Sequence, residues 1–168
     1  MSEHVVQGLA TEELQEELRD LLDLAVVGDH VRWVVVGDEA GGLADWLAEA
    51  VPQWRALADQ VSRHLVTLGV APDGRVRSLA EDIPVHWVPE GWLSADEARR
   101  LIAYRLRTVA GWARYRRSQA VDPDTVQLLE AVCSRLEAQA RAVESLLVDV
   151  GDTDALAVAD RSRGGPSA

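Results

Sequence analysis

Four long segments of this chain repeat apolar residues every three or four positions, and this pattern constrains the fold more than any other feature. Such spacing gives each helix one apolar face, which must be buried against another element. No convincing alternation typical of a strand is present. The repeating residues include Leu14, Leu18 and Leu21 in the first segment, Leu43, Leu47, Trp54, Val61 and Leu65 in the second, Ile102, Leu106 and Val109 in the third, and Leu129, Val132, Leu136 and Val143 in the fourth.

Local signals divide the first half of the chain into a helical hairpin. Thr11 is a good N-cap for the first helix, and Gly37 is a typical stop signal after Val36. The second helix is predicted to end at Gly69, and Pro52 is expected to bend it. The first two helices are therefore predicted to be neighbours joined by a short loop.

A stretch rich in proline and glycine, residues 70–93, separates this hairpin from a second one. We predict a crossing loop there, with one short helix near Ser78–Asp82. The third helix should begin at Ser94, where Glu97 completes a capping box, and the fourth at Asp122, which a proline follows. Two hairpins with one long connection predict an all-α, four-helix bundle with a single crossover, as in ferritin-like folds.

The chain of 168 residues is predicted to be one domain. We expect an N-terminal tail at 1–10, the bundle at 11–150 and a disordered tail at 151–168. No apolar run approaches the roughly 20 residues that a membrane span needs, and the N-terminal residues lack a signal-peptide pattern. A single cysteine, Cys133, fits a reducing compartment. These features predict a cytoplasmic protein that binds no membrane.

The charge of the chain disfavours general binding to nucleic acid. There are 28 acidic residues against 17 basic ones, all of them arginine, for a net charge of −11. Such a surface repels phosphate backbones. The third helix is the exception, because five arginines share a sector of about 100°. This stripe predicts a solvated face, a subunit contact, or a surface for DNA or an acidic partner; it consists of Arg99, Arg100, Arg107, Arg114 and Arg117.

Several stretches resemble one known family. Trp33, Val35, Gly37 and Leu43 keep the apolar framework of a family signature, and Asp122-Pro123 opens the last helix in the same way. The loop segments Pro72–Asp82 and Pro89–Trp92 are similar as well. From about Leu14 to Leu147, the chain resembles the Dps family, the miniferritins that protect bacterial DNA under starvation and oxidative stress. The resemblance implies iron as the metal, a hollow dodecamer or a mixed shell with an active relative, and association with the nucleoid.

The resemblance also maps the family's five ferroxidase ligand positions onto this chain. The two histidine positions are Arg32 and Ala44, the next acidic position is Ala48, and the aspartate and glutamate positions are Asp59 and Arg63. Only Asp59 matches the family. Helical periodicity places Ala44, Ala48, Asp59 and Arg63 on one flank of the second helix, away from its apolar stripe. The flank has a simpler interpretation, in which Asp59 and Arg63 form an ordinary solvated ion pair four residues apart.

Arg32 falls at the helical phase of Leu14 and Leu18, so we expect it to be partly buried. A buried arginine needs an acidic partner, and Asp59 is a candidate. We therefore hypothesise that one or both guanidiniums, of Arg32 and Arg63, occupy the electrostatic place of iron.

Asp122 matches a position near a threefold pore that, in the family, attracts iron into the cage, and Asp124 would add to that acidic ring. Asp122 is also expected to cap its helix, and the two roles are compatible.

Three functions follow from these observations. The first is a stress-associated structural or regulatory cage component with weak or no ferroxidase activity. The second is an active ferroxidase and iron store that uses a displaced site with Asp59, His30 and nearby acids. The third is a binding module for DNA or an acidic partner through the arginine stripe. The residues themselves specify no cofactor.

Overall fold

A computed structural model describes the backbone of residues 3–82 and 88–161, and the side chains of residues 11–79 and 88–145. It confirms the all-α bundle of four long helices with one crossover that carries a short helix. Within the described residues, none of the helices is long and apolar enough to cross a membrane. The elements are α1 (Glu3–Val34), β1 (Val35–Val36), α2 (Ala40–Thr67), α3 (Val76–Asp82), β2 (Leu93–Ser94), α4 (Ala95–Gln119) and α5 (Pro123–Arg161).

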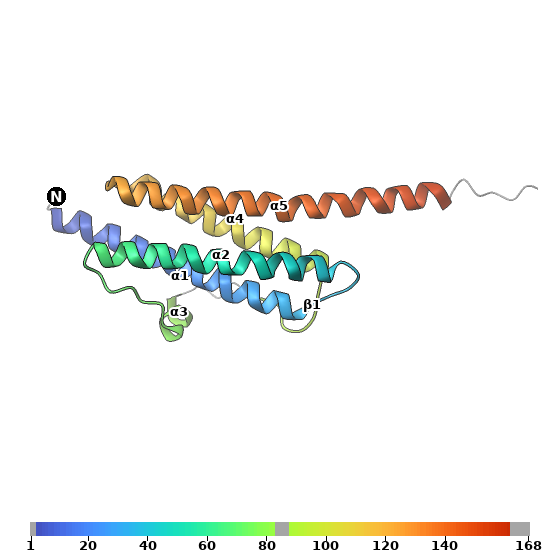
Figure 1. The fold of residues 1–168 in the computed structure, drawn as a ribbon, viewed down its shortest axis with the longest axis horizontal. Coiled ribbons are helices and arrows are strands. Elements are labelled where there is room, and N and C mark those ends of the chain that lie inside the picture. The colour runs from blue at the N-terminus through green and yellow to red at the C-terminus, as the bar shows by residue number, and fades with distance from the viewer. Residues whose placement is uncertain (1–2, 83–87, 162–168) are drawn as a thin grey trace, which may run out of the picture.

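The two hairpins lie against each other along most of their length (Figure 1). α1 packs against α2 and also against α4, while α4 and α5 form the second hairpin. The crossover follows the outside of the α1–α2 pair, where α3 lies (Figure 1). Gln15 of α1 holds the first part of the crossover in place. The Gln15 side chain donates to the Asp73 carbonyl at 2.7 Å and accepts from the Asp73 N–H at 2.9 Å.

The predicted apolar positions form the core. Leu14, Leu47, Ile102 and Leu136, one from each long helix, are almost completely buried. Trp54 is also fully buried, and its indole N–H donates to Gln139 Oε1 at 2.7 Å, which joins α2 to α5. The bundle is therefore held by residues that the helical spacing alone identifies.

Both predicted caps at the second hairpin are confirmed. The Ser94 hydroxyl accepts from the Glu97 N–H at 3.3 Å, and Glu97 accepts from the Ser94 N–H at 2.9 Å, so the capping box is complete. Asp122 accepts from the Thr125 N–H at 2.7 Å and caps α5. These contacts involve residues three positions apart, which explains why the sequence predicts them.

A short parallel strand pair was not predicted. Val35 pairs with Leu93 and Val36 with Ser94, which ties the end of α1 to the start of α4. Two-residue strands are too short to show any alternation of apolar and polar residues. Gly37 follows β1 with φ of 108°, a conformation that L side chains rarely adopt.

The helices are longer at both chain ends than predicted. α1 begins at Glu3, so Thr11 lies inside a helix and is not its N-cap, and α5 continues past Gly151 to Arg161. The helices therefore extend over residues 3–10 and 151–161 of the predicted tails, whereas 1–2 and 162–168 lie outside the described residues. One interior glycine costs a helix only about 1 kcal/mol, and the alanine-rich residues after Gly151 favour continuation.

Gly28 marks the closest approach of α1 and α2. A Cβ atom there would lie 2.5 Å from Trp54 Cζ3 and 2.6 Å from Val51 Cγ2, both in buried side chains. We expect Gly28→Ala to lower the free energy of unfolding by roughly 1–3 kcal/mol, because overpacking outweighs the gain in helix propensity. Urea unfolding measures this change.

Gly111→Ala is the matched control for this substitution. A Cβ at Gly111 in α4 meets no atom within 4 Å, so the alanine should stabilise the helix by up to about 1 kcal/mol. Equal effects of the two substitutions would contradict a close helix contact at Gly28.

Candidate functional site

Four of the five ligand positions predicted from the resemblance lie along an outer flank of α2. Ala48, Asp59 and Arg63 are exposed, and Ala44 is half-buried, while the intervening Leu47 belongs to the core. The two alanines carry no atom that could bind a metal. Of these α2 positions, only Asp59 and Arg63 can take part in polar chemistry.

The Asp59 carboxylate forms an ion pair with an arginine. The Arg63 guanidinium donates through Nη2 to Asp59 Oδ2, one helical turn away. Both side chains are largely exposed, at 55% for Asp59 and 74% for Arg63. The acid and the base thus form the i,i+4 pair that their spacing predicts.

Arg32 is partly buried as expected, but it does not pair with Asp59, the candidate partner. Its Nη2 lies 3.3 Å from Oδ1 of Asp29, one turn earlier in α1, and not against Asp59. The other oxygen of Asp29 accepts from Arg55 of α2 at 2.9 Å. Asp29 is nearer along the helix, and Asp59 is engaged by Arg63. Two guanidiniums therefore share one carboxylate beside the α2 flank.

Arg55 was missed by sequence reasoning, although it stands one turn before Asp59 on the same helix. Arg55 and Asp29 line an open groove of about 580 Å³ between α1, α2 and residues 88–90. His30 and Trp33 also line it. Among the side chains that the structure describes, no three His, Cys, Asp or Glu residues gather closely enough to hold a metal ion.

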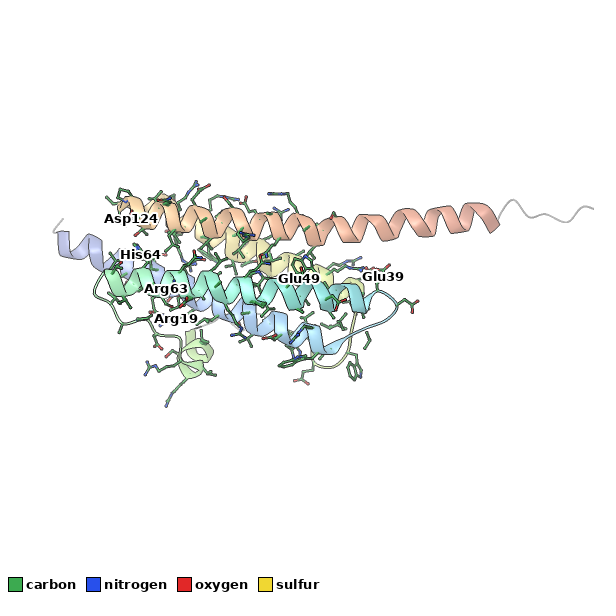
Figure 2. All side chains as sticks on the ribbon, in the orientation of Figure 1. Arg19, Glu39, Glu49, Arg63, His64 and Asp124 are labelled. Atoms are coloured by element: carbon green, nitrogen blue, oxygen red, sulfur yellow. The ribbon has the colours of Figure 1, made fainter. Side chains whose placement is uncertain are left out.

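A second polar group joins α2 to α5 at one end of the bundle. His64 Nε2 lies 2.7 Å from the Thr125 hydroxyl and 3.7 Å from the Asp122 carboxylate. The Thr125 hydrogen bonds hold the pKa of Asp122 below its usual range. Asp124 is exposed in the first turn of α5, near His64 at this end (Figure 2). His64 and Thr125 are 61 positions apart, so no local signal predicts their contact.

Most of the arginine stripe of α4 is paired with acids, which does not favour the anion-binding alternative among the three that the sequence left open. Three of its members pair with acids of α5: Arg107 with Glu144 at 2.5 Å, Arg114 with Glu137, and Arg117 with Glu130. These glutamates recur every seven residues and so share one face of α5. The sequence of α4 does not reveal this pairing, because the acids belong to the neighbouring helix α5.

The other two stripe members differ from each other. Arg99 is buried and lies 2.5 Å from Glu39 and 3.5 Å from Asp96, so it anchors the loop before α2. Arg100 is exposed. The five arginines therefore do not form one solvated surface.

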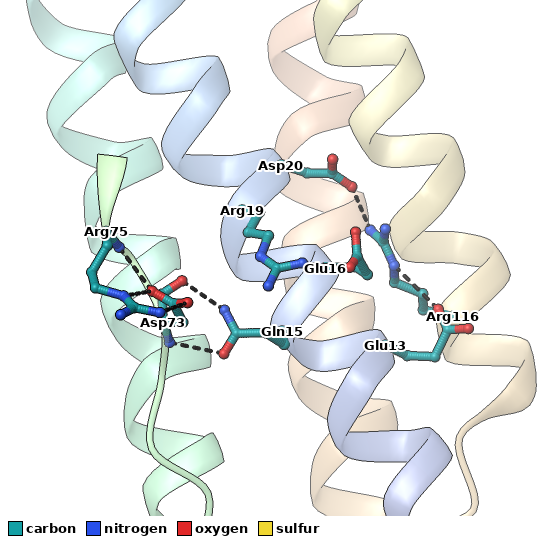
Figure 3. Close-up of polar contacts among 8 residues, drawn as sticks. All are labelled: Glu13, Gln15, Glu16, Arg19, Asp20, Asp73, Arg75 and Arg116. Atoms are coloured by element: carbon teal, nitrogen blue, oxygen red, sulfur yellow. Dashed lines mark hydrogen bonds and ion pairs between the residues drawn. The ribbon is translucent and has the colours of Figure 1, made fainter. Parts of the chain in front are cut away.

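A buried ionic cluster between α1 and α4 was also missed. Arg116 Nη1 donates to Glu17 at 2.8 Å and to Asp20 at 2.7 Å, and its Nε lies 3.4 Å from Glu13. Figure 3 shows this arginine reaching from α4 to the acids of α1. Arg105 pairs with Asp23, about one turn beyond Asp20 on α1. These contacts join the two hairpins.

Glu17 has an unusual environment for a carboxylate. Its side chain is fully buried, and burial raises its pKa to about 7 although the nearby Arg116 acts in the opposite direction. Burial alone would lower the pKa of Arg116, but the charges of Glu17 and Asp20 raise it overall. The sequence held a signal for this residue, because Glu17 shares the buried face of Leu14 and Leu21.

Comparisons with known proteins agree with this architecture. The family model for the ferritin-like domain matches residues 11–151. DpsA14 from Streptomyces coelicolor superposes with a TM-score of 0.81 at 25% identity, covering 84% of this chain and 86% of that one. Mycobacterium smegmatis Dps in its tetragonal form gives 0.80 at 23% identity, with 84% and 87% covered, which supports the fold alone.

Two curated relatives match over shorter stretches. The fine tangled pili major subunit of Haemophilus ducreyi is 32% identical over 108 residues, 60% of this chain and 57% of that protein. The DNA protection during starvation protein of Mycolicibacterium smegmatis is 33% identical over 69 residues, 41% and 38% of the two chains. The chain thus spans less than two thirds of the length of either relative. By its domain match, fold and sequence, the chain belongs to the ferritin-like family and, within it, to the Dps proteins.

Proposed function

We propose that this chain is a subunit of a Dps-like, homo-oligomeric cytoplasmic cage with weak or no ferroxidase activity of its own. Its role would be structural or regulatory in iron storage and stress protection, as a dodecamer or in a mixed shell with an active relative. One observation carries the proposal. The single acid kept at a ligand position, Asp59, is paired with the arginine that stands at another ligand position.

The chemistry of the flank supports this proposal. Iron sites in proteins use carboxylate and imidazole ligands, and the methyl groups of Ala44 and Ala48 supply neither. Arg63 adds a fixed positive charge where the metal-binding glutamate would stand, and Arg32 and Arg55 place two more guanidiniums near Asp29. A divalent cation approaching this flank would meet electrostatic repulsion and few donor atoms.

The proposal is tested by restoring the ligands in one variant: Arg32→His, Ala44→His, Ala48→Asp and Arg63→Glu. We expect the unmodified protein to bind no Fe(II) at this site and to oxidise it no faster than buffer with peroxide. The restored variant should bind Fe(II) in a fixed ratio to subunits. Native mass spectrometry with and without Fe(II) reports both the metal ratio and the assembly size, and absorbance of ferric product reports oxidation.

Asp59→Asn in the restored background is the matched control, and it should remove the gained iron. A folded restored variant that binds no iron would refute the mapping of the ligand positions. Rapid oxidation by the unmodified protein would instead support the displaced site, with Asp59, His30 and nearby acids. That alternative has less support, because Asp29 beside His30 is already engaged by two arginines.

Two further roles stay within the same proposal. Asp122 and Asp124 are exposed at the start of α5 and would supply an acidic entrance for iron in an assembled cage. DNA binding through the arginine stripe has less support, because α5 glutamates neutralise Arg107, Arg114 and Arg117.

A further inference from the structure

Charged side chains fill a buried contact between α1 and α4. Arg105 and Arg116 enter it from α4 and are only 3% and 6% exposed, and Glu17 enters it from α1 and is 0% exposed. Arg105 pairs with one acid of α1, and Arg116 pairs with three. We call this contact the α1–α4 seam; its members are Glu13, Glu17, Asp20, Asp23, Arg105 and Arg116.

Some polar atoms of the α1–α4 seam are buried without a partner. Nε and Nη1 of Arg105 and Oε1 of Glu17 are covered, and they have no hydrogen-bond partner among the residues that the structure describes. The ion pairs use other atoms of these groups, since Arg105 meets Asp23 through Nη2 and Glu17 meets Arg116 through Oε2. Folded proteins pair nearly all buried polar atoms with protein groups or ordered water. A second subunit could not reach these atoms, because their own chain covers them.

The charges of the α1–α4 seam decide what could pair with these atoms. Four acids face two arginines there, so an anion beside Arg105 would be repelled by the surplus of carboxylates. A cation would suit Glu17 Oε1, but it could not accept a hydrogen bond from the two free N–H groups of Arg105. Water accepts from an N–H group and donates to a carboxylate oxygen. Of these three kinds of ligand, only water fits both places.

The side chains between the two arginines are short. Arg105 and Arg116 stand about three turns apart on the same face of α4. Val109 and Ala113 lie between them on that face, and both are buried. Neither can fill the height that an arginine side chain sets between two helices. An internal water needs polar partners as well as room, and each arginine stands beside acids of α1 that can supply them.

We propose that the α1–α4 seam binds ordered internal water, one molecule beside Arg105 and one beside Glu17. The first accepts from the Arg105 guanidinium, and the second forms a hydrogen bond with Glu17 Oε1 whether or not that oxygen carries a proton. Folded proteins hold about one buried water per 27 residues, so two are well within what a chain of 168 residues contains. The second molecule also gives buried Glu17 a route for proton exchange through the more exposed Glu13 and Asp20. This inference is independent of the iron site.

A crystal structure of the full chain, at a resolution that shows ordered water, tests this proposal. We expect one density peak at about 2.7–3.2 Å from Nε or Nη1 of Arg105, and another at that distance from Oε1 of Glu17, in every subunit. Arg105→Met should remove the first peak and keep the second. Arg107→Met is the matched control, because it makes the same change at a half-exposed arginine of α4 and should keep both peaks. The unmodified protein decides the matter even if Arg105→Met does not fold.

Crystals grown with bromide, and others grown with rubidium, identify what occupies the two places. Both ions give an anomalous X-ray signal, whereas water gives none. A bromide peak beside Arg105 would assign that place to an anion, a rubidium peak beside Glu17 would assign the other to a cation, and either result would overturn the proposal. It is also overturned if either place is dry in the unmodified protein, or if Arg107→Met removes the peaks as Arg105→Met does.

Discussion

Replacing Arg116 by methionine is expected to lower the free energy of unfolding by about 3–5 kcal/mol near pH 8. Arg116 is the cation that directly contacts Glu17, whose carboxylate is fully buried. Removing the guanidinium leaves that carboxylate without compensation, and a second acid, Asp20, loses the same partner. Methionine retains much of the apolar volume, so the loss of charge should dominate. Urea unfolding followed by circular dichroism measures the change.

Two controls separate the buried charge from a general effect of removing an arginine. Arg114→Met, on the same helix as Arg116, breaks a partly exposed pair with Glu137 of α5 and should cost less than about 1 kcal/mol. Glu17→Gln in the Arg116→Met background should recover much of the lost stability, since it removes the uncompensated charge. If Arg114→Met and Arg116→Met cost the same, Arg116 does not stabilise a buried carboxylate.

The unmodified protein is expected to lose stability as the pH rises from about 5 to about 8. The pKa of Glu17 is raised from 4.5 to about 7 in the folded state, because burial disfavours its ionised form. Between these two values the folded state binds more protons than the unfolded state, so stability falls with increasing pH. The stability that neutral Glu17 contributes is fully present below about pH 4.5 and is lost as the pH rises through about 7. A shift of this size corresponds to about 3 kcal/mol.

Glu17→Gln tests the origin of this pH dependence. Glutamine has nearly the same shape and stays neutral, so the variant should show a flatter profile between about pH 5 and 8. Groups that do not interact with Glu17 contribute alike to both profiles and cancel in the difference. The carboxylates of Glu97 and Glu144, whose pKa values hydrogen bonds lower, contribute in the opposite direction and at lower pH. An unchanged profile in Glu17→Gln would show that another group is responsible.

Arg116→Met links these two predictions. Near pH 5 Glu17 is protonated, so the variant should be destabilised much less than near pH 8. A cost that is independent of pH would mean that Arg116 acts through packing rather than through charge.

Much of the fold follows from short-range patterns in the sequence. Helical spacing identifies the buried Leu14, Leu47 and Leu136, and the contacts at Ser94 and Asp122 fix where α4 and α5 begin. These interactions connect residues three or four positions apart, so they depend little on the rest of the chain. Such local signals do not fix the helix boundaries near the chain ends, because α1 begins before Thr11 and α5 continues past Gly151.

The candidate site could be predicted only in part. The residue types at the five predicted ligand positions come from the sequence, and the mapping of those positions stays a prediction from the family resemblance. The i,i+4 pair of Asp59 and Arg63 also follows from spacing. Arg32 could not be assigned a partner in this way, because several acids lie within reach of a long, flexible side chain. Asp29 was the nearest along its own helix.

The sequence by itself determined the order of the helices and their apolar faces, and it predicts the loss of four ligands at the proposed metal positions. Only the tertiary structure decided where the charges are neutralised. Arg107 finds Glu144 across 37 positions, and Arg116 finds Glu17 across 99. Ion pairs impose no period on a sequence, and a guanidinium can reach many acids. The packing of the helices selects one of them, and so turns an apparent arginine surface into contacts that hold the bundle together.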